Sequence, residues 1–280
     1  MGKMLSSLFR HPSGRIGLVI IGFYLLAAIL GTLGLTPHDP LKLFAIDRLK
    51  APSGTYWFGT DLLGRDAFSR LMVGIRQSML IAFASVAIAT IAGTIIGLLS
   101  AWWGGIWDGI FMRVMDVLLA FPAILLALLI IAIVGPGTMT SVAAIAIVYT
   151  PIFARVVRGP ALSLKQRDFV DAARTFGSSQ SYVLTRHLLL NPVAPLAVQV
   201  TLALAWALLT EAGLSFLGLG TQPPTPSLGL MLAESRNLMT HAPWLMIFPA
   251  VTIMLGILGF NLTGDALRDI LDPRTQRREA

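Results

Sequence analysis

The stretch DFVDAARTFG, residues 168–177, lies inside residues 155–192, the longest polar interruption in the second half of a very apolar chain. Its apolar spacing of i, i+3, i+4 and i+7 predicts one face of a short helix, made by Phe169, Ala172, Ala173 and Phe176. Asp168 can cap the start of this helix, and Gly177 can end it in a left-handed turn. A helix of about two turns is marginal alone in water. It must therefore dock, either on the protein's own helix ends or on a soluble partner.

The composition of the whole chain predicts an all-α integral membrane protein. Of its 280 residues, 55% are hydrophobic and 12% are charged, against roughly 25% charged in an average soluble domain. Ionised side chains are expensive in a bilayer, so the deficit indicates that the chain sits in lipid. There is no cysteine, the four histidines are scattered, and the net charge of +7 is divided among short tracts. We therefore expect no metal site, no cofactor and no nucleic-acid partner.

Six apolar runs are long enough for a helix to cross the hydrocarbon core, which takes about 20 residues. The expected spans are residues 16–35, 79–101, 114–134, 138–157, 193–212 and 244–263. Segments on the side of the N-terminus hold 14 lysines and arginines, and those on the other side hold 7. The positive-inside rule therefore predicts that both termini and the 155–192 loop are cytoplasmic.

These spans divide the chain into five expected parts. They are a cytoplasmic N-terminus (1–15), a first transmembrane helix (16–35), an extracytoplasmic segment (36–77), a core of five transmembrane helices that includes the 155–192 loop (78–263), and a cytoplasmic tail (264–280).

Small and polar residues within the spans predict how the helices pack. The second span carries a small residue at every fourth position, Ser85, Ala89, Gly93 and Gly97, and such a ladder lets a neighbouring helix approach closely. Pro122 should kink the third span. Arg113 and Asp116 are about one turn apart and can pair, as can Asp265 with Arg268 or Asp269 in the tail.

The fifth span contains polar side chains in an apolar background. Amides and hydroxyls in lipid need partners or a watery cavity, so the candidates for lining a translocation path are Gln199, Thr201, Trp206 and Thr210. The alternative is that these side chains form hydrogen bonds between helices. Glu211 should end the span and face outside.

The two extracytoplasmic segments contain dense turn and charge patterns. In GTDLLGRDAFSR, residues 59–70, Asp61 and Asp66 can pair with Arg65 and Arg70 and cap the helix that follows. The second segment carries SFLGLG at residues 215–220, a Pro-Pro pair at 223–224 and PSLG at 226–229.

Four of these patterns resemble one family. Asp171-Ala-Ala, followed after three further residues by Gly177, is similar to the cytoplasmic EAA loop of the permease subunits of ABC importers, with Asp171 in place of Glu and Leu190 in place of the final Pro. The patterns at 59–70, at 215–229 (with Leu228 where Trp is usual) and at 261–273, which includes Asp-Pro, resemble the dipeptide, oligopeptide and nickel branch.

The resemblance implies a type I ABC importer permease fold and a multi-pass protein of a bacterial or archaeal inner membrane. It implies a second homologous permease subunit, two ATP-binding subunits, an extracytoplasmic solute-binding protein and alternating access. It also implies that the ATP-binding subunits are contacted by the coupling residues Phe169, Asp171, Ala172, Ala173, Phe176 and Gly177. Di- and oligopeptides are the expected solutes, and nickel complexes, glutathione or a small glycosidic compound are the alternatives.

The sequence also bears on rival functions. It contains no phosphate-binding G-x-x-x-x-G-K-[ST] loop, so we expect no enzymatic activity and expect partner subunits to hydrolyse ATP. A secondary transporter or channel would need ionisable residues within the spans for ion coupling, and almost none lie away from their ends. A membrane-embedded enzyme would need a nucleophile or metal constellation, and the sequence shows none.

Overall fold

The structure is a computed structural model and describes residues 7–167 and 192–271. Within these residues the regular elements are helices, and the β pairing is one isolated bridge between Thr60 and Asp66. The long helices are α2 (Pro12–Thr32), α3 (Ala67–Trp103), α4 (Gly105–Ala120), α5 (Ala123–Val134), α6 (Thr138–Lys165), α9 (Val193–Phe216) and α11 (Trp244–Leu271). The short ones are η1 (Ala45–Asp47), α10 (Leu228–Ser235) and η3 (Arg236–Leu238).

Five of these helices are each long and apolar enough to cross a membrane: α2, α3, α6, α9 and α11. The pair α4–α5 meets the same criterion only when taken together, and its two helices meet at 95°. Five of the six expected spans are thus continuous helices, and the third, residues 114–134, falls on the bent α4–α5 pair, which has the form of a broken span or a re-entrant loop. Several helices extend beyond the apolar runs, because α3 already begins at Ala67 and α6 continues to Lys165.

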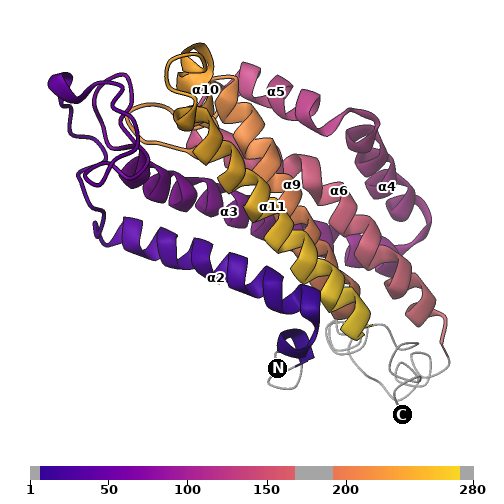
Figure 1. Cartoon of the computed structure of the whole chain (residues 1–280). Helices are drawn as coiled ribbons and strands as arrows, with labels where there is room; N and C mark the ends of the chain where they lie inside the picture. The colour runs from indigo at the N-terminus through magenta and orange to yellow at the C-terminus, as the bar shows by residue number, and fades with distance from the viewer. Residues whose placement is uncertain (1–6, 168–191, 272–280) are drawn as a thin grey trace.

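The bundle has a lower and an upper end, named as they lie in Figure 1. The lower end holds the start of α2 and the end of α11, where a Cβ on Gly17 would meet the Thr263 hydroxyl at 2.5 Å. It also holds the end of α6 and the start of α9, which flank residues 168–191. The upper end holds residues 33–66 and α10.

The predicted close approach at the small-residue ladder of α3 is confirmed, and α6 is the helix that uses it. A Cβ on Gly93 would meet the Phe153 Cβ at 2.5 Å and the Thr150 carbonyl at 2.7 Å. A Cβ on Gly97 would meet the Ala154 carbonyl at 2.5 Å. Any larger side chain at these positions would force the helices apart, so the glycines set how closely α3 and α6 pack.

The predicted kink at Pro122 is confirmed and is a full break. α4 ends at Ala120, and Phe121 takes an extended conformation with φ −89° and ψ 139°. A residue before proline avoids the helical region because the proline ring crowds its backbone. Pro122 then serves as the N-cap of α5, and the two halves of the span diverge by 95°.

One predicted ion pair of the tail differs in the structure. The carboxyl of Asp269 lies 3.5 Å from the Nε2 atom of His11, just before α2. The expected pairing of Asp265 with Arg268 or Asp269 is not among the ion pairs found in residues 7–167 and 192–271, and Asp269 instead contacts the residue before α2. α2 approaches α11 closely here, since a Cβ on Gly14 would lie 3.1 Å from the Ala266 Cβ, and this places His11 within reach.

Candidate functional site

The upper end is organised by the GTDLLGRDAFSR stretch. Asp66 is the N-cap of α3, and its carboxylate accepts hydrogen bonds from the Ser69 N–H at 3.0 Å and the Ser69 hydroxyl at 2.5 Å. Asp61 shapes the preceding turn, because one of its oxygens accepts from the backbone N–H groups of Leu63 at 2.8 Å and Arg65 at 3.0 Å. The predicted cap of the helix is thus confirmed for Asp66, which also lies 3.5 Å from the His38 ring.

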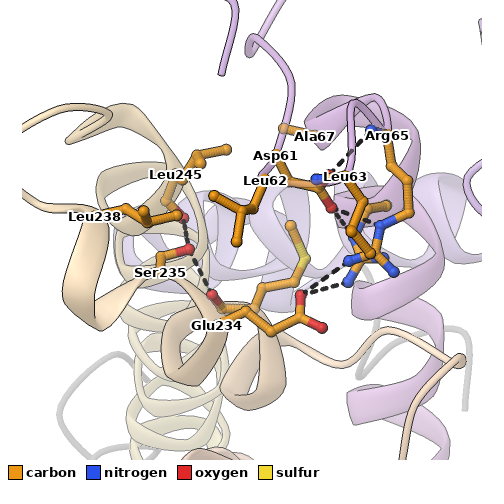
Figure 2. A pocket seen from close by; sticks show the side chains of 11 residues that line it. Asp61, Leu62, Leu63, Arg65, Ala67, Glu234, Ser235, Leu238 and Leu245 are labelled. Carbon is orange, nitrogen blue, oxygen red and sulfur yellow. Dashed lines mark hydrogen bonds and ion pairs between the residues drawn. The ribbon is translucent and has the colours of Figure 1, made fainter. Parts of the chain in front are cut away.

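A cluster of two arginines and two carboxylates joins this stretch to α10 (Figure 2). Arg65 Nε lies 2.6 Å from Asp61, and Arg70 Nε lies 3.5 Å from the same oxygen. These two predicted pairs of Asp61 are confirmed. The fourth member, Glu234, was not predicted from the sequence, and it lies 2.7 Å from Arg70 and 3.5 Å from Arg65. Only 2% of the Arg70 side chain is exposed.

The cluster borders a cavity of about 240 Å³ whose other walls are almost entirely apolar. The apolar walls come from Leu62, Leu63, Ala67, Met231, Leu238 and Leu245. The charged side chains here are mutually paired, and within residues 7–167 and 192–271 no group of three metal-ligating side chains lies close enough to hold a metal ion. The cluster therefore acts as a structural clasp between segments 61–70 and 228–245.

The structure divides the candidate path residues of α9 between two faces. Gln199 and Trp206 are seven residues apart and share a face, on which Trp206 is 59% exposed. Leu209 and Gly213 continue this face, and a Cβ on Gly213 would lie 3.4 Å from the Ile124 side chain of α5. In the isolated chain this surface, which we call the α9 face, is uncovered over much of its length and reaches the α4–α5 break.

The other two candidates lie in helix contacts. Thr201 packs on α11, where a Cβ on Gly264 would meet its hydroxyl at 2.5 Å, and this hydroxyl donates to the Val198 carbonyl at 2.7 Å. Thr210 is buried, and its hydroxyl lies 3.0 Å from that of Tyr149 in α6. For Thr210 the alternative of hydrogen bonding between helices is the one realised in the structure.

The prediction that Glu211 ends the span and faces outside is wrong. α9 continues to Phe216, and Glu211 is 0% exposed. Its Oε1 atom accepts a hydrogen bond from the Ser215 hydroxyl at 2.7 Å. Ser78 of α3 and Ser227, the residue before α10, also lie near this carboxyl, whose Oε2 atom has no hydrogen-bond partner among the described residues. The sequence did not reveal this arrangement, because its members come from three separate elements.

At the lower end, polar contacts tie the end of α6 to α3 and α4. The guanidinium of Arg158 donates two hydrogen bonds to Asp108 of α4, at 2.7 and 2.6 Å. The Lys165 ammonium, on the last residue of α6, donates to the carbonyls of Ala101 and Trp102 of α3 at 3.0 and 2.5 Å. Since Lys165 lies three residues before Asp168, these contacts hold the helix that leads directly into the 168–177 stretch.

The predicted pair of Arg113 and Asp116 is wrong. Asp116 instead pairs with Arg155 of α6 at 2.5 Å. α4 lies beside α6, so the carboxylate finds an arginine on the neighbouring helix. The coupling residues Phe169, Asp171, Ala172, Ala173, Phe176 and Gly177 all lie outside the described residues, and their role stays a prediction.

Comparison with known proteins gives a consistent match. Residues 93–277 match the family described as "Binding-protein-dependent transport system inner membrane component". The dipeptide transport system permease protein DppC of Alkalihalophilus pseudofirmus is 44% identical over 97% of this chain and 89% of its own length. The glutathione transport system permease protein GsiD of Pectobacterium atrosepticum is 43% identical over 95% of this chain and 88% of its own length.

The fold also matches a solved structure. A chain of the MetNI methionine ABC transporter in an inward-facing conformation superposes with a TM-score of 0.57, at 17% sequence identity. The match covers 71% of this chain and 94% of that chain. At this identity the likeness concerns the fold, which is that of a type I importer permease. With a helical bundle of membrane-spanning length, this chain therefore belongs to the binding-protein-dependent transport system inner membrane component family, the membrane permease subunits of ABC importers.

Proposed function

We propose that this chain is one of two permease subunits of an ATP-driven importer of di- and oligopeptides. The observation that carries the proposal is the identity of 42–44% over nearly the full chain to permeases named for dipeptide, D,D-dipeptide and glutathione transport. Glutathione is itself a tripeptide, so the three names share short peptides as a substrate class. Nickel complexes and small glycosidic compounds remain the alternatives within the same importer type.

The proposed orientation places the lower end in the cytoplasm. The lower end carries the start of α2 and the end of α11, which continue into the two termini. It also carries Arg155, Arg158 and Lys165 near the end of α6, in agreement with the excess of positive residues expected on the cytoplasmic side. The upper end, with residues 36–66 and α10, then faces outward and meets the solute-binding protein.

In the proposed mechanism the ATP-binding subunits act through residues 169–177. The stretch joins α6 to α9, and a short rigid helix held at both ends can transmit a displacement that a flexible loop would dissipate. On the α6 side, the contacts of Arg158 with Asp108 and of Lys165 with the end of α3 pass such a displacement to α3 and α4. Two helices, α3 and α4, would therefore move with the end of α6.

The translocation path lies between this chain and its partner permease in our proposal. Gln199 and Trp206 lie on the uncovered α9 face, and the α4–α5 break lies beside its upper part. Thr201 packs on α11 in this conformation and would line the path only if α9 turns. Movement of α6 and α9 at the lower end would expose the α9 face alternately to either side.

The reconstituted importer provides the test. We expect proteoliposomes containing this chain, its partner permease and two ATP-binding subunits to take up a labelled dipeptide only with ATP and the binding protein present. Uptake by this chain alone, driven by an ion gradient, would show a secondary transporter instead. ATP-dependent uptake of nickel complexes without any peptide uptake would retain the importer and contradict the peptide assignment.

A further inference from the structure

A fully buried carboxyl at the upper end of α9 has no part in the mechanism described so far. Glu211 is 0% exposed, and none of the ion pairs found among residues 7–167 and 192–271 includes it. An acidic side chain inside a membrane bundle is expensive and is typically retained for a function. The Ser215 hydroxyl donates to its Oε1 atom at 2.7 Å, Ser78 and Ser227 lie near it, and its Oε2 atom has no hydrogen-bond partner among the described residues.

The three serines link this carboxyl to the backbone of the upper loop. Each serine oxygen accepts a backbone N–H at 3.2 Å, with Ser215 accepting from Thr221, Ser78 from Leu228 and Ser227 from Leu230. A hydroxyl that accepts through its oxygen still has its own proton to donate. Ser215 therefore donates to Glu211 while it holds the turn at Thr221, and Ser78 and Ser227, beside the carboxyl, hold the start of α10. We call the segment 217–235 the upper cap.

We infer that Glu211 is a positioning residue that locks the upper cap onto the upper ends of α3 and α9. The packing leaves little room for any other arrangement, because a Cβ on Gly229 of the cap would collide with the Ala212 carbonyl of α9. A Cβ on Gly74 of α3 would lie 3.4 Å from the Met231 sulfur. With the carboxyl removed, the Ser215 hydroxyl, which also holds the backbone N–H of Thr221, would lose its acceptor in a sealed site.

The contacts of Glu211 affect the translocation path because they hold the side of α9 that faces away from it. Glu211 and Gly213 are two residues apart, which is about 200° around the helix, so Glu211 grips the side opposite the α9 face. Because this side of α9 is held, the position of Trp206 and Leu209 along the helix axis is fixed, and so is the direction in which they face the path. This consequence rests on the proposed function, whereas the lock itself rests on the contacts alone.

The first test is the Glu211→Gln variant in the complete importer. Glutamine keeps the shape but replaces one acceptor oxygen with an NH₂ group that can only donate. We expect the maximal uptake rate to fall about tenfold while the half-saturating solute concentration and complex assembly stay unchanged. Asp39→Asn, which removes an exposed carboxylate of the same end, is the matched control and should transport normally. Normal maximal uptake by Glu211→Gln would overturn the inference.

The second test needs no transport and so separates this inference from the proposed function. The chain has no cysteine, which allows Leu230→Cys to report on the buried start of α10. In the purified importer this thiol should resist a maleimide, and adding Glu211→Gln should speed labelling at least about tenfold by opening the cap. Met239→Cys, at a 55% exposed position, should label equally in both backgrounds. Equal labelling of Leu230→Cys with and without Glu211→Gln would refute the lock.

A double-mutant cycle shows whether the serines act through Glu211. Ser215→Ala alone should accelerate labelling of Leu230→Cys by a smaller factor than Glu211→Gln. The double variant should label no faster than Glu211→Gln alone, because both changes break the same contact. If the two substitutions instead multiplied their separate effects on the labelling rate, Ser215 would not act through Glu211.

Discussion

The upper and lower ends of the bundle hold their charges in opposite ways. At the upper end, Arg70 and Glu211 are almost fully buried, and Arg70 pairs with a carboxylate 164 residues away. At the lower end, the pair of Arg155 with Asp116 leaves about half of each side chain exposed. Removing one partner of a buried pair leaves an uncompensated charge and is costly, whereas exposed pairs contribute little. The Arg70 pair thus locks the upper end, whereas the Arg155 pair at the lower end can rearrange at low cost.

This difference agrees with the direction in which force is proposed to travel. A displacement arriving at the lower end meets contacts that can slide, apart from those of Arg158 and Lys165, which bind α6 to its neighbours. The upper end keeps the helices in register while the lower end moves. Substitutions at one end at a time can therefore test whether the two ends differ in this way.

The largest effect is expected from Gly177→Val at the lower end. A β-branched residue is poorly accommodated at positive φ, so the predicted helix stop of the coupling stretch should fail. We expect ATP-driven uptake below about a tenth of normal, with membrane insertion intact and weaker recovery of the ATP-binding subunits on purification. Gly54→Val, at an upper-end position with open space around it, is the control. Normal transport by Gly177→Val would mean that this stretch is a mere connector.

Glu234→Ala should destabilise the upper end by about 2 kcal/mol, since it leaves the buried Arg70 with only the more distant Asp61. Because Glu234 is partly exposed, the expected loss of stability is smaller than that for breaking a fully buried ion pair. The matched change at the lower end, Asp116→Ala, should cost about 0.5 kcal/mol or less. Thermal unfolding of the purified importer measures both effects. Equal decreases in the unfolding temperature for the two variants would contradict the proposed difference between the ends.

Arg158→Ala should lower uptake about fivefold without abolishing ATP hydrolysis, because α6 would no longer carry α4 with it. The side chains of Arg158 and Asp108 are 31% and 21% exposed, so we expect an interaction free energy of about 1 kcal/mol between them. The exchanged pair, Asp108→Arg with Arg158→Asp, should recover part of the loss. Arg155→Ala should change uptake less than about twofold, and an Arg158→Ala variant as active as Arg155→Ala would count against this route.

The smallest effect concerns pH and the exposed loop before α3. The Lys50 ammonium and the Tyr56 hydroxyl, which donates at 2.7 Å, lower the pKa of Asp47 below its ordinary value. A lowered folded-state pKa contributes stability above the unfolded-state pKa near 3.8, and this is lost as pH falls through the lowered value. Hydrogen exchange of residues 45–56, relative to the intrinsic exchange rate at each pH, should therefore rise slightly below pH 4. In Asp47→Asn that rise should be absent, and an unchanged rise would assign it to other groups.

Local patterns allowed the fold to be predicted from sequence. The lengths of the apolar runs indicated the spans, Asp66 was correctly predicted to cap α3, and the small-residue ladder at Gly93 correctly predicted close packing. Each of these features depends on residues that are neighbours in sequence. The break at Pro122 was located, but its 95° angle was not, since α4 is turned by its contacts with α6. Asp116 was paired wrongly for the same reason.

The features that lock the upper end could not be predicted. Glu234 lies 164 residues from Arg70, and nothing in its local sequence marks it as a partner. Glu211 was placed at the end of a span because an acid usually limits an apolar run. Its burial depends on Ser78 and Ser227, which only the packing of α3 and α10 brings together. Contacts between residues so far apart in sequence form only when the helices pack against one another.

The central claim is that force from the ATP-binding subunits enters this permease through residues 169–177. In the natural cysteine-free chain, Ala172→Cys provides a single thiol for cross-linking within membrane vesicles that contain the whole importer. The account predicts an efficient cross-link to an ATP-binding subunit and protection from an impermeant reagent added outside intact cells. Labelling of this thiol from outside, or a cross-link to no ATP-binding subunit, would contradict it.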